Sequence, residues 1–322
     1  MAFLETRGLT KTYGAHLALK GLDLALEKGE LFGLLGPNGA GKTTTLGLLT
    51  GILRITSGEI TVADYVYPAQ VKEAQRVMGI VPDESNLYDE LDGFQNLCFC
   101  GALYGIRKRD REERARELLE TFGLSAAARR PFKSFSRGMR RRLTIAAAMM
   151  HRPTILFLDE PTTGIDVESA RHVRRLIQEL HRSGTTILLT THYIEEAERL
   201  CTLIGFLVEG RLVRVGSLGQ LLDEAQEETV VEILLGDEEA HRGRELLGRQ
   251  FPHLALESRD GRSIRVRSDG PCNLAPLIKA LDESGLQVYE ARILRPSLED
   301  VFVKVTGIEA YRMRQEKEKA RP

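Results

Sequence analysis

The sequence predicts an α/β fold built on an open sheet of buried parallel strands. Three short apolar runs, residues 31–35, 155–158 and 185–189, lack the polar–apolar alternation of a half-exposed strand. Continuous aliphatic and β-branched runs of this length are typical of parallel strands that helices cover on both faces. Each run is followed by a loop and then by a helical pattern or a further element, which indicates alternating strands and helices.

Two additions to this core are predicted from the periodicity of apolar residues. Residues 3–30 alternate apolar and polar positions, which predicts an antiparallel β subdomain with a turn at Tyr13 and Gly14. Residues 87–150 have a helical pattern and predict an α-helical insert. One face of a charged helix in this insert, which ends at Gly123, carries the apolar residues Ala115, Leu118, Leu119 and Phe122.

A small α+β C-terminal domain is predicted after a main domain over residues 1–222. The composition becomes more polar after Gly216, and residues 223–228 are predicted as a linker. Beyond it we expect strands at 229–235, 254–258, 263–267 and 286–293, helices at 238–247, 274–281 and 298–305, and a hairpin turn at Asp260 and Gly261. This order resembles a split β-α-β, ferredoxin-like sandwich over residues 229–306. Nothing in it has catalytic spacing, so it is interpreted as a dimer-supporting or regulatory module, with a charged tail at 307–322.

The strand at 31–35 leads into a glycine-rich phosphate loop with the sequence Gly36, Pro37, Asn38, Gly39, Ala40, Gly41, Lys42 and Thr43. These residues match every fixed position of G-x-x-x-x-G-K-[ST], and a helical pattern follows over residues 44–53. The glycines let successive amide hydrogens point inward and bind polyphosphate at a helix N-terminus. Lys42 would reach the β and γ phosphates, and the Thr43 hydroxyl would coordinate a bridging magnesium ion. The alternative is a plain glycine-rich turn.

Three further candidate residues are expected at the carboxyl edge of the same sheet, where ligands of open α/β sheets bind. Asp159 follows the run 155–158 and would hold the hydration shell of the magnesium ion, while Glu160 would polarise the attacking water. His192 follows the run 185–189 and could contact the γ phosphate or orient Glu160. An acidic pair after a strand is otherwise a helix cap or a solvated loop, and a lone histidine there is usually structural.

A second candidate anion site begins at Ser136, followed by Arg137, Gly138 and Met139 and then by a helical run over residues 140–150. Serine is a favoured N-cap, and the start of a helix with a neighbouring glycine can bind an anion. One nucleotide hardly needs two phosphate cradles from one chain. The second cradle is therefore expected to serve the nucleotide of another copy, so that two chains enclose two ATP molecules.

These motifs, in this order over residues 3–220, resemble the ATP-binding subunit of an ATP-binding-cassette (ABC) transporter. The resemblance implies a P-loop NTPase, RecA-like core that uses ATP and Mg²⁺. It identifies residues 36–44, ending at Thr44, with the Walker A loop, and Asp159 with Glu160 as the Walker B pair. It identifies residues 136–139 with the signature motif and His192 with the switch histidine.

The resemblance implies three further site residues. Tyr13 stands where the family places an aromatic ring that stacks on adenine, although a core tyrosine is the alternative. Asp166 ends the loop that communicates between the two sites. Asp83 replaces the usual glutamine that contacts magnesium and the membrane partner, and a carboxylate there could still bind a water of the metal. Arg137 and Met139 replace the common glycine and glutamine, which resembles the subgroup that serves drug, lipid or ion exporters.

The same resemblance implies the partners. A homodimer, or a pseudo-symmetric dimer, would act with separate transmembrane permease subunits, so the chain would be cytoplasmic and peripheral at the cytoplasmic face of the cell membrane. Five apolar residues are candidate contacts for a permease or simply pack the insert: Leu87, Tyr88, Phe94, Leu97 and Phe99. The run Arg140, Arg141 and Arg142 is interpreted as a solvated helix face.

Composition is consistent with these expectations. The 45 basic and 46 acidic residues give a net charge of −1, which offers no electrostatic case for nucleic acid. The four cysteines have no metal-ligand spacing and suit a reducing cytosol. No segment approaches the roughly 18 apolar residues of a membrane span, and the first residues lack a signal-peptide pattern, so no direct membrane insertion is expected.

The alternative function is a soluble ABC-type ATPase with a mechanochemical or regulatory role outside transport. Such proteins that act on DNA or ribosomes would usually show a coiled-coil insertion, paired cassettes or a basic surface, and none is visible in the sequence. A purely regulatory module would be expected to have lost catalytic residues. Lys42, Glu160 and His192 are all present, so the sequence favours transport.

Overall fold

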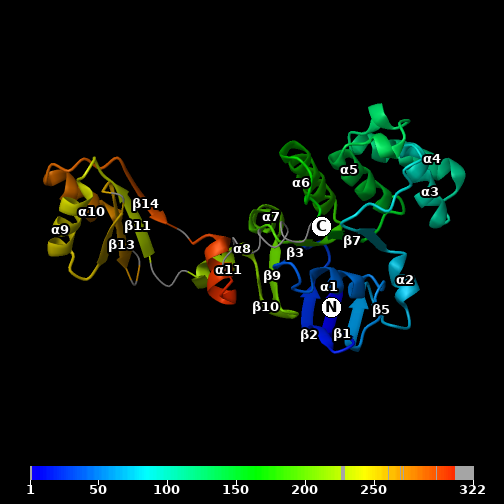
Figure 1. Ribbon diagram of the computed structural model, residues 1–322, viewed down its shortest axis with the longest axis horizontal. Helices are drawn as coiled ribbons and strands as arrows, with labels where there is room; N and C mark the ends of the chain where they lie inside the picture. Colours follow the sequence, from blue (N-terminus) through cyan, green and yellow to red (C-terminus); the bar gives the residue numbers. More distant parts are fainter. Residues whose placement is uncertain are drawn as a thin grey trace. The chain divides into compact units, whose positions relative to one another are not determined.

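The computed structural model describes residues 2–225, 229–259, 261–268, 270, 272–294 and 296–308. They form two compact units, residues 2–218 with 305–308 and residues 219–304. Figure 1 shows the elements of both units along the chain. The first unit has two sheets and the second unit has one, and each unit has its own hydrophobic core.

The first unit is built on a six-stranded sheet in the order β10-β9-β3-β8-β7-β6. The strands are β3 (Leu31–Leu35), β6 (Met78–Val81), β7 (Ile155–Asp159), β8 (Thr186–Thr191), β9 (Leu203–Val208) and β10 (Arg211–Gly216). All neighbours pair in parallel except β9 and β10. Every residue of β3, β7 and β8 is buried. The predicted α/β fold with buried parallel strands is confirmed.

The helices of this α/β core connect its strands. They are α1 (Lys42–Leu49), α2 (Val71–Gln75), α6 (Val167–Arg182) and α7 (Ile194–Leu200). The amphipathic α6 buries Ala170, Val173, Leu176 and Ile177 and exposes its charged face. Asp166 caps its first turn by accepting a hydrogen bond from the amide of Ser169 at 2.9 Å. These connections bring the loops after β3, β7 and β8 to one edge of the sheet.

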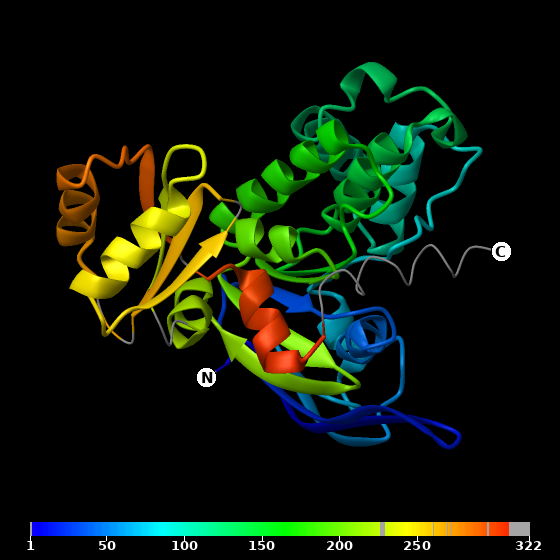
Figure 2. The same ribbon diagram turned by 60° about the vertical axis from the view of Figure 1, so that its left-hand side comes forward.

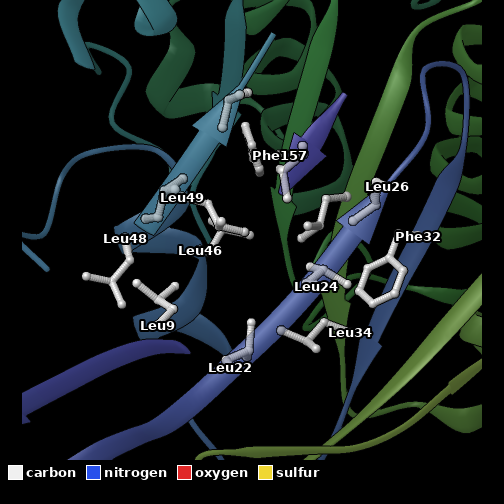
Figure 3. Packing of buried hydrophobic residues seen from close by; sticks show 14 of the residues in the cluster. Leu9, Leu22, Leu24, Leu26, Phe32, Leu34, Leu46, Leu48, Leu49 and Phe157 are labelled. Carbon is white, nitrogen blue, oxygen red and sulfur yellow. The ribbon is translucent and has the colours of Figure 1, made fainter. Parts of the chain in front are cut away.

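A four-stranded antiparallel sheet, in the order β2-β1-β4-β5, stands beside the core. Its strands are β1 (Leu4–Tyr13), β2 (His16–Leu26), β4 (Ser57–Val62) and β5 (Tyr65–Val66). As predicted, β1 and β2 form a hairpin whose turn follows Tyr13. Figure 3 shows its buried side chains meeting those of β3, α1 and β7: Leu9, Leu22, Leu24, Leu26, Phe32, Leu34, Leu46, Leu48, Leu49 and Phe157. This shared core holds the loop between β3 and α1 from both sides.

A helical insert separates β6 from β7. It contains α3 (Gly93–Leu103), α4 (Lys108–Thr121), the 3₁₀ turns η1 (Ser125–Ala127) and η2 (Phe132–Ser134), and α5 (Arg137–Ala148). The apolar face predicted for α4 is buried, with Phe122 completely inaccessible. In both ribbon views the insert and the antiparallel sheet lie at opposite ends of the first unit (Figures 1 and 2). Helix α5 leads from the insert back to β7.

The second unit contains a four-stranded antiparallel sheet in the order β12-β13-β11-β14. Its elements are β11 (Thr229–Leu234), α9 (Ala240–Gln250), β12 (Ala255–Arg259), β13 (Ser263–Ser268), α10 (Leu274–Glu283) and β14 (Glu290–Leu294), together with most of α8 (Leu218–Ala225) and of α11 (Leu298–Thr306). From β11 to β14 this is the connectivity of a split β-α-β unit. Helices α9 and α10 cover one face of the sheet (Figures 1 and 2).

The predicted linker differs from the structure at its start. Residues 223–225 are the last residues of α8, because its apolar residues, among them the buried Leu221, extend the helical pattern beyond the polar composition that suggested a linker. Residues 226–228 of that predicted linker lie outside the described residues. So do Asp260 of the predicted hairpin turn and residues 309–322 of the predicted charged tail.

Candidate nucleotide-binding and catalytic site

The phosphate loop connects β3 to α1, and two of its glycines pack closely against neighbouring strands. A Cβ atom on Gly36 would clash with the carbonyl oxygen of Leu207 on β9. Gly41 caps α1 with a φ of 105°, a left-handed conformation that other residues rarely adopt. A Cβ there would also lie 2.9 Å from Leu19 on β2. Glycine is therefore required at both positions to turn the strand into the helix.

Lys42, the first residue of α1, points back into the loop. Its Nζ atom donates hydrogen bonds to the carbonyl oxygens of Gly36 at 2.8 Å and Pro37 at 3.1 Å. It also lies 3.4 Å from Oε1 of Glu160. The ammonium group is buried, so its charge is screened weakly by solvent and acts strongly on any anion in the loop.

Strand pairing brings Asp159, Glu160 and His192 together. Strands β7 and β8 are parallel neighbours, with Asp159 opposite Thr190. The Thr190 hydroxyl donates to Oδ1 of Asp159 at 2.5 Å, and the amide of Glu160 donates to the carbonyl oxygen of Thr190 at 3.2 Å. Glu160 adopts a φ of 47°, in the left-handed region. The sheet thus fixes an unfavourable backbone conformation that turns this carboxylate toward the loop.

Both carboxylate oxygens of Glu160 have buried partners. Oε2 lies 2.7 Å from Nδ1 of His192 and accepts a hydrogen bond from the Thr163 hydroxyl at 2.9 Å, while Oε1 faces Lys42. Burial alone would raise the pKa of Glu160, but the hydrogen bond with His192 and the charge of Lys42 outweigh it, so the pKa lies below its ordinary value. An ionised carboxylate only accepts hydrogen bonds, so Nδ1 of His192 is the donor.

A pocket of about 310 Å³ opens at this edge of the sheet. It is lined by Tyr13, His16, Ala18, Asn38, Gly39, Gly41, Lys42, Thr43, Thr44, Asp83 and Glu160. The ring of Tyr13 is 45% exposed at its mouth, so it is not the core tyrosine of the alternative interpretation. Pro37 and Ala40 belong to the same loop, and Asp159 lies buried at the end of β7. One cavity is thus lined by nine of the predicted site residues: Tyr13, Asn38, Gly39, Gly41, Lys42, Thr43, Thr44, Asp83 and Glu160.

The signature residues lie elsewhere on the chain. Ser136 caps α5 by accepting a hydrogen bond from the amide of Met139 at 3.2 Å, and its side chain is exposed. Gly138 is buried against Ser169 of α6, where a Cβ atom would clash. Arg137 reaches the carbonyl oxygen of Gly164 at 3.5 Å. None of the four residues 136–139 lines the pocket of the phosphate loop.

The prediction of a solvated arginine face is wrong for Arg141, which is 7% exposed. Its Nη1 donates to the carbonyl oxygen of Pro82 at 2.7 Å, and its Nη2 donates to that of Asp83 at 2.6 Å. Nη2 also lies 3.4 Å from the carbonyl oxygen of Glu160 and 3.4 Å from Oδ1 of Asp83. Asp83 lines the pocket beside the phosphate loop, and its carboxylate also contacts Arg141.

Glu196, which was not among the predicted site residues, is a second buried carboxylate beside Glu160. Its two oxygens accept hydrogen bonds from the hydroxyls of Thr162 at 2.6 Å and Thr191 at 2.7 Å. Burial raises the pKa of Glu196. Two threonine pairs, 162–163 and 190–191, flank Glu160 and His192 in the sequence, and they were the available signal for this hydrogen-bond network.

For one of the five apolar residues of the insert, burial favours the packing alternative. Leu97 on α3 is completely buried. Tyr88 and Phe99 are exposed and contact each other edge to face, with ring centroids 5.0 Å apart. Leu87 and Phe94 are partly buried. Within the described residues, no helix is both long enough and apolar enough to span a membrane.

Comparisons with known proteins identify the family of the chain. The family profile of ABC transporters matches residues 19–163. The chain is 38% identical to the Nod factor export ATP-binding protein I of Cupriavidus metallidurans, over 96% of this chain and 98% of that protein. It is 40% identical to the linearmycin resistance ATP-binding protein LnrL of Bacillus subtilis, over 71% of this chain and 74% of that protein. It is 35% identical to the daunorubicin/doxorubicin resistance ATP-binding protein DrrA of Streptomyces peucetius, over 94% of this chain and 92% of that protein.

Solved structures give the same result. An ATP-binding subunit of an ABC transporter matches with a TM-score of 0.63 at 29% identity, over 69% of this chain and 92% of that chain. The ATP-binding cassette MJ0796 matches with a TM-score of 0.62 at 26% identity, over 67% of this chain and 98% of that chain. That structure is a dimer in a post-hydrolysis state with bound ADP and phosphate.

The chain therefore belongs to the ABC transporter family, and the predicted resemblance is confirmed. It is a P-loop ATPase subunit that binds ATP and hydrolyses it to drive transport. Cassettes of this family act as dimers together with membrane permeases.

Proposed function

We propose that two copies of this chain close head to tail on two ATP molecules. Each triphosphate would be bound by the phosphate loop of one copy and by Ser136 and Gly138 of the other. The observation that carries this proposal is the separation of the two anion sites. The pocket around Lys42 contains no signature residue, while the exposed cap of α5 presents its amide groups outside that pocket.

Within one site, the roles follow from the groups around the pocket. The main-chain N–H groups of the phosphate loop after Pro37 and the ammonium group of Lys42 bind the β and γ phosphates. The exposed ring of Tyr13 at the pocket mouth stacks on adenine. Asp166 lies at the exposed end of the loop that follows Glu160, where it can cap α6 and face the other copy at the same time.

The oxygen groups of the site fit Mg²⁺ held together with phosphate. Magnesium prefers hard oxygen ligands and is usually bound by one or two carboxylates or hydroxyls plus substrate phosphates. Thr43 and Asp83 line the pocket, and Asp159 ends β7 beside it. No group of three or more acidic, histidine or cysteine side chains among the described residues forms a metal cage. Thr43 and Asp159, with water bound by Asp83, would hold an ion that neutralises charge on the phosphates.

Hydrolysis requires one proton acceptor, and Glu160 has the position and charge for it. As a water oxygen bonds to the γ phosphorus, the bond to the bridging oxygen breaks, its electron pair leaves with ADP, and the proton of the water passes to Glu160. His192 and Thr163 hold Oε2 of Glu160, so the carboxylate keeps its orientation. Loss of the γ phosphate then removes the link to Ser136 of the other copy and allows the dimer to open.

The mechanical output would pass to separate permease subunits through exposed apolar residues of the insert. Tyr88, Phe99, Leu103 and Tyr104 are all exposed, and Leu103 and Tyr104 border a groove of about 940 Å³ that reaches α2 and β6. Exposed patches of this kind are typical of protein interfaces. Docking there would make the chain peripheral at the cytoplasmic face of the membrane. The names of the relatives, Nod factor export and daunorubicin resistance, support outward transport.

The experiment that tests the dimer combines two substitutions, Glu160→Gln and Ser136→Asp. Glu160→Gln should bind ATP with Mg²⁺, lose turnover and accumulate as a dimer in light scattering. Ser136→Asp in the same background keeps a good N-cap but puts a carboxylate where the γ phosphate would bind, so the dimer should be lost while ATP binding remains. Ser134→Asp, on the neighbouring exposed turn, is the matched control and should still dimerise.

Two results would contradict the proposal. One is a Glu160→Gln protein that stays monomeric at saturating ATP. The other is a Ser136→Asp variant that dimerises as tightly as the Ser134→Asp control, because the anion site of α5 would then play no part in closure.

A further inference from the structure

Arg141 connects three separate parts of the chain. It lies on α5, five residues after the cap Ser136, which is roughly 7 Å along the helix axis. Its guanidinium group hydrogen-bonds to the main chain of the loop after β6, at Pro82 and Asp83, and lies 3.4 Å from the carbonyl oxygen of Glu160. One side chain thus ties the signature helix to the loop that carries Asp83 and to the catalytic glutamate of the same chain.

These contacts are costly to break because the group is buried. A guanidinium group stays charged in proteins and needs hydrogen-bond partners for its five N–H groups. Nη1 donates to the carbonyl oxygen of Pro82, and the two N–H groups of Nη2 are shared among the carbonyl oxygens of Asp83 and Glu160 and the carboxylate of Asp83. If α5 shifts, Arg141 must carry its carbonyl partners along or lose them at the penalty of an unpaired buried charge. A planar fork that binds several carbonyls at once is a geometry that lysine cannot reproduce.

The hydrogen-bond partners of Arg141 determine how a shift of α5 would affect Glu160. Glu160 already holds a left-handed backbone conformation, so its carboxylate direction depends on how its peptide groups are held. Its amide is bound by Thr190 and its carbonyl oxygen lies beside Arg141. A small displacement of α5 would therefore move Arg141 and with it the carbonyl group of Glu160. The amide group of Glu160 would stay in place because Thr190 on β8 binds it.

We propose that Arg141 is a positioning residue that couples the two ATP sites. This inference rests on the proposed head-to-tail dimer, in which Ser136 touches the nucleotide held by the other copy. Engagement of that nucleotide sets the position of α5, and Arg141 transmits this position to Glu160 of its own chain and to the loop with Asp83. Each glutamate is then aligned for hydrolysis when the opposite site is filled.

A mixed dimer separates this role from simple support of α5. One copy, the active copy, keeps Glu160, and the other, the inactive copy, carries Glu160→Gln. The single working site contains Glu160 of the active copy and Ser136 of the inactive copy. If Arg141 positions Glu160 of its own chain, Arg141→Gln lowers turnover when placed in the active copy. If Arg141 merely supports its own Ser136, the loss follows the inactive copy.

The expected result is a loss of roughly 10- to 100-fold in kcat with Arg141→Gln in the active copy, because small misplacements of a reacting group have effects of this size. The KM for ATP should change by less than about threefold, since no group that binds the nucleotide is removed. The same substitution in the inactive copy should leave kcat within about threefold. Arg141→Lys should give the same pattern with a smaller loss, and it keeps the test valid if Arg141→Gln does not fold.

Arg142 provides the matched control. It is the next residue on α5, but its Nη1 donates to the carbonyl oxygens of Phe122 and Gly123 inside the insert. Arg142→Lys in the active copy should therefore leave kcat unchanged. In a homodimer with native Glu160, Arg141→Gln should also reduce the Hill coefficient for ATP toward 1, and Arg142→Lys should not.

The outcomes are distinguishable. Equal losses in the active and inactive copies, a loss confined to the inactive copy, or no loss in either would overturn the role of Arg141 while leaving the dimer intact. Light scattering of the Glu160→Gln protein with ATP is measured first. A protein that stays monomeric there refutes the head-to-tail dimer itself and this coupling with it.

Discussion

His192 and Glu160 form a buried contact of 2.7 Å between Nδ1 and Oε2 that joins the ends of two neighbouring strands. Glu160 directly follows β7 and His192 directly follows β8, and the parallel pairing of these strands brings the two side chains to the same edge of the sheet. The second oxygen of Glu160 lies 3.4 Å from Lys42 in the phosphate loop. The carboxylate is thus held from two sides by groups that favour its ionised form.

Replacing His192 with alanine should reduce turnover and shift its pH dependence. The hydrogen bond with His192 is the largest of the interactions that lower the pKa of Glu160, so its loss raises that pKa. Because Glu160 must be ionised to accept a proton, the acid limb of the kcat profile should move to higher pH. We expect a roughly 10²-fold loss in kcat at neutral pH, the lower end of what general base catalysis contributes.

Thr163→Val is the graded control for that experiment. Thr163 donates to the same Oε2 atom at 2.9 Å but lowers the pKa of Glu160 less than His192 does. The acid limb of the kcat profile of Thr163→Val should therefore also move to higher pH, but by a smaller amount. An unchanged pH–rate profile in His192→Ala would show that the histidine does not control the glutamate.

Replacing Lys42 with alanine should weaken ATP binding itself. Hydrogen bonds to a charged group contribute about 1.5–3 kcal/mol, which corresponds to roughly 10- to 100-fold in Kd. Calorimetric titration of ATP measures this directly, and a thermal unfolding curve checks that the loop carbonyls bound by Lys42 tolerate the change. Lys28→Ala, at an exposed lysine before β3, controls for the loss of one positive charge. Equal affinities for the two variants would exclude the phosphate-loop role of Lys42.

The sequence was sufficient for the core fold because its signals are local. The runs that became β3, β7 and β8 are continuous and apolar, which is typical of strands covered on both faces. The phosphate loop has fixed spacing between a strand and a helix. The proximity of Glu160 and His192 could also be expected, because both follow parallel strands of one sheet.

Arg141 and Glu196 could not be placed by the same reasoning. A run of three arginines is typical of a solvated helix face. Arg141, however, lies on the same side of α5 as the buried residues Gly138 and Ile145, three and four positions away. That spacing could have indicated from the sequence that Arg141 is buried. Glu196 sits in an acidic helix start, and only the tertiary contacts with Thr162 and Thr191 reveal that it is buried.

Glu196→Gln should raise the stability of the protein at neutral pH. Burial is the main cause that raises the pKa of Glu196 above its ordinary value of 4.5. The hydrogen bonds from Thr162 and Thr191 oppose this shift without cancelling it, and the charge of Glu160 adds to it. The native state therefore binds this proton more tightly than the unfolded chain does. Below pH 4.5 the residue is neutral in both states, and the penalty of the buried charge develops as pH rises above that value.

The difference in stability between Glu196→Gln and the native sequence should therefore grow with pH. Each kcal/mol corresponds to roughly 2–4 °C in Tm for a domain of this size, and we expect an increase of about that order at pH 8 that vanishes near pH 4. Glu195→Gln, at the exposed neighbouring residue, should show no such trend. A Tm difference that stays constant across this pH range would mean that the carboxylate of Glu196 is not the source of the effect.

Gly138→Ala should destabilise the first unit although alanine favours helices. An ideal Cβ at Gly138 would clash with the side chain of Ser169 on α6, and overpacking of this kind costs about 1–3 kcal/mol, more than the 0.5–1 kcal/mol that alanine contributes in a helix. Ser169→Gly removes the clashing atoms, so the double variant should lose less stability than the sum of the two single variants. Gly219→Ala on α8 meets no atom within 4 Å and should be neutral or stabilising. Thermal unfolding of the four proteins measures the coupling, and strictly additive Tm changes would mean that α5 and α6 do not meet at these two residues.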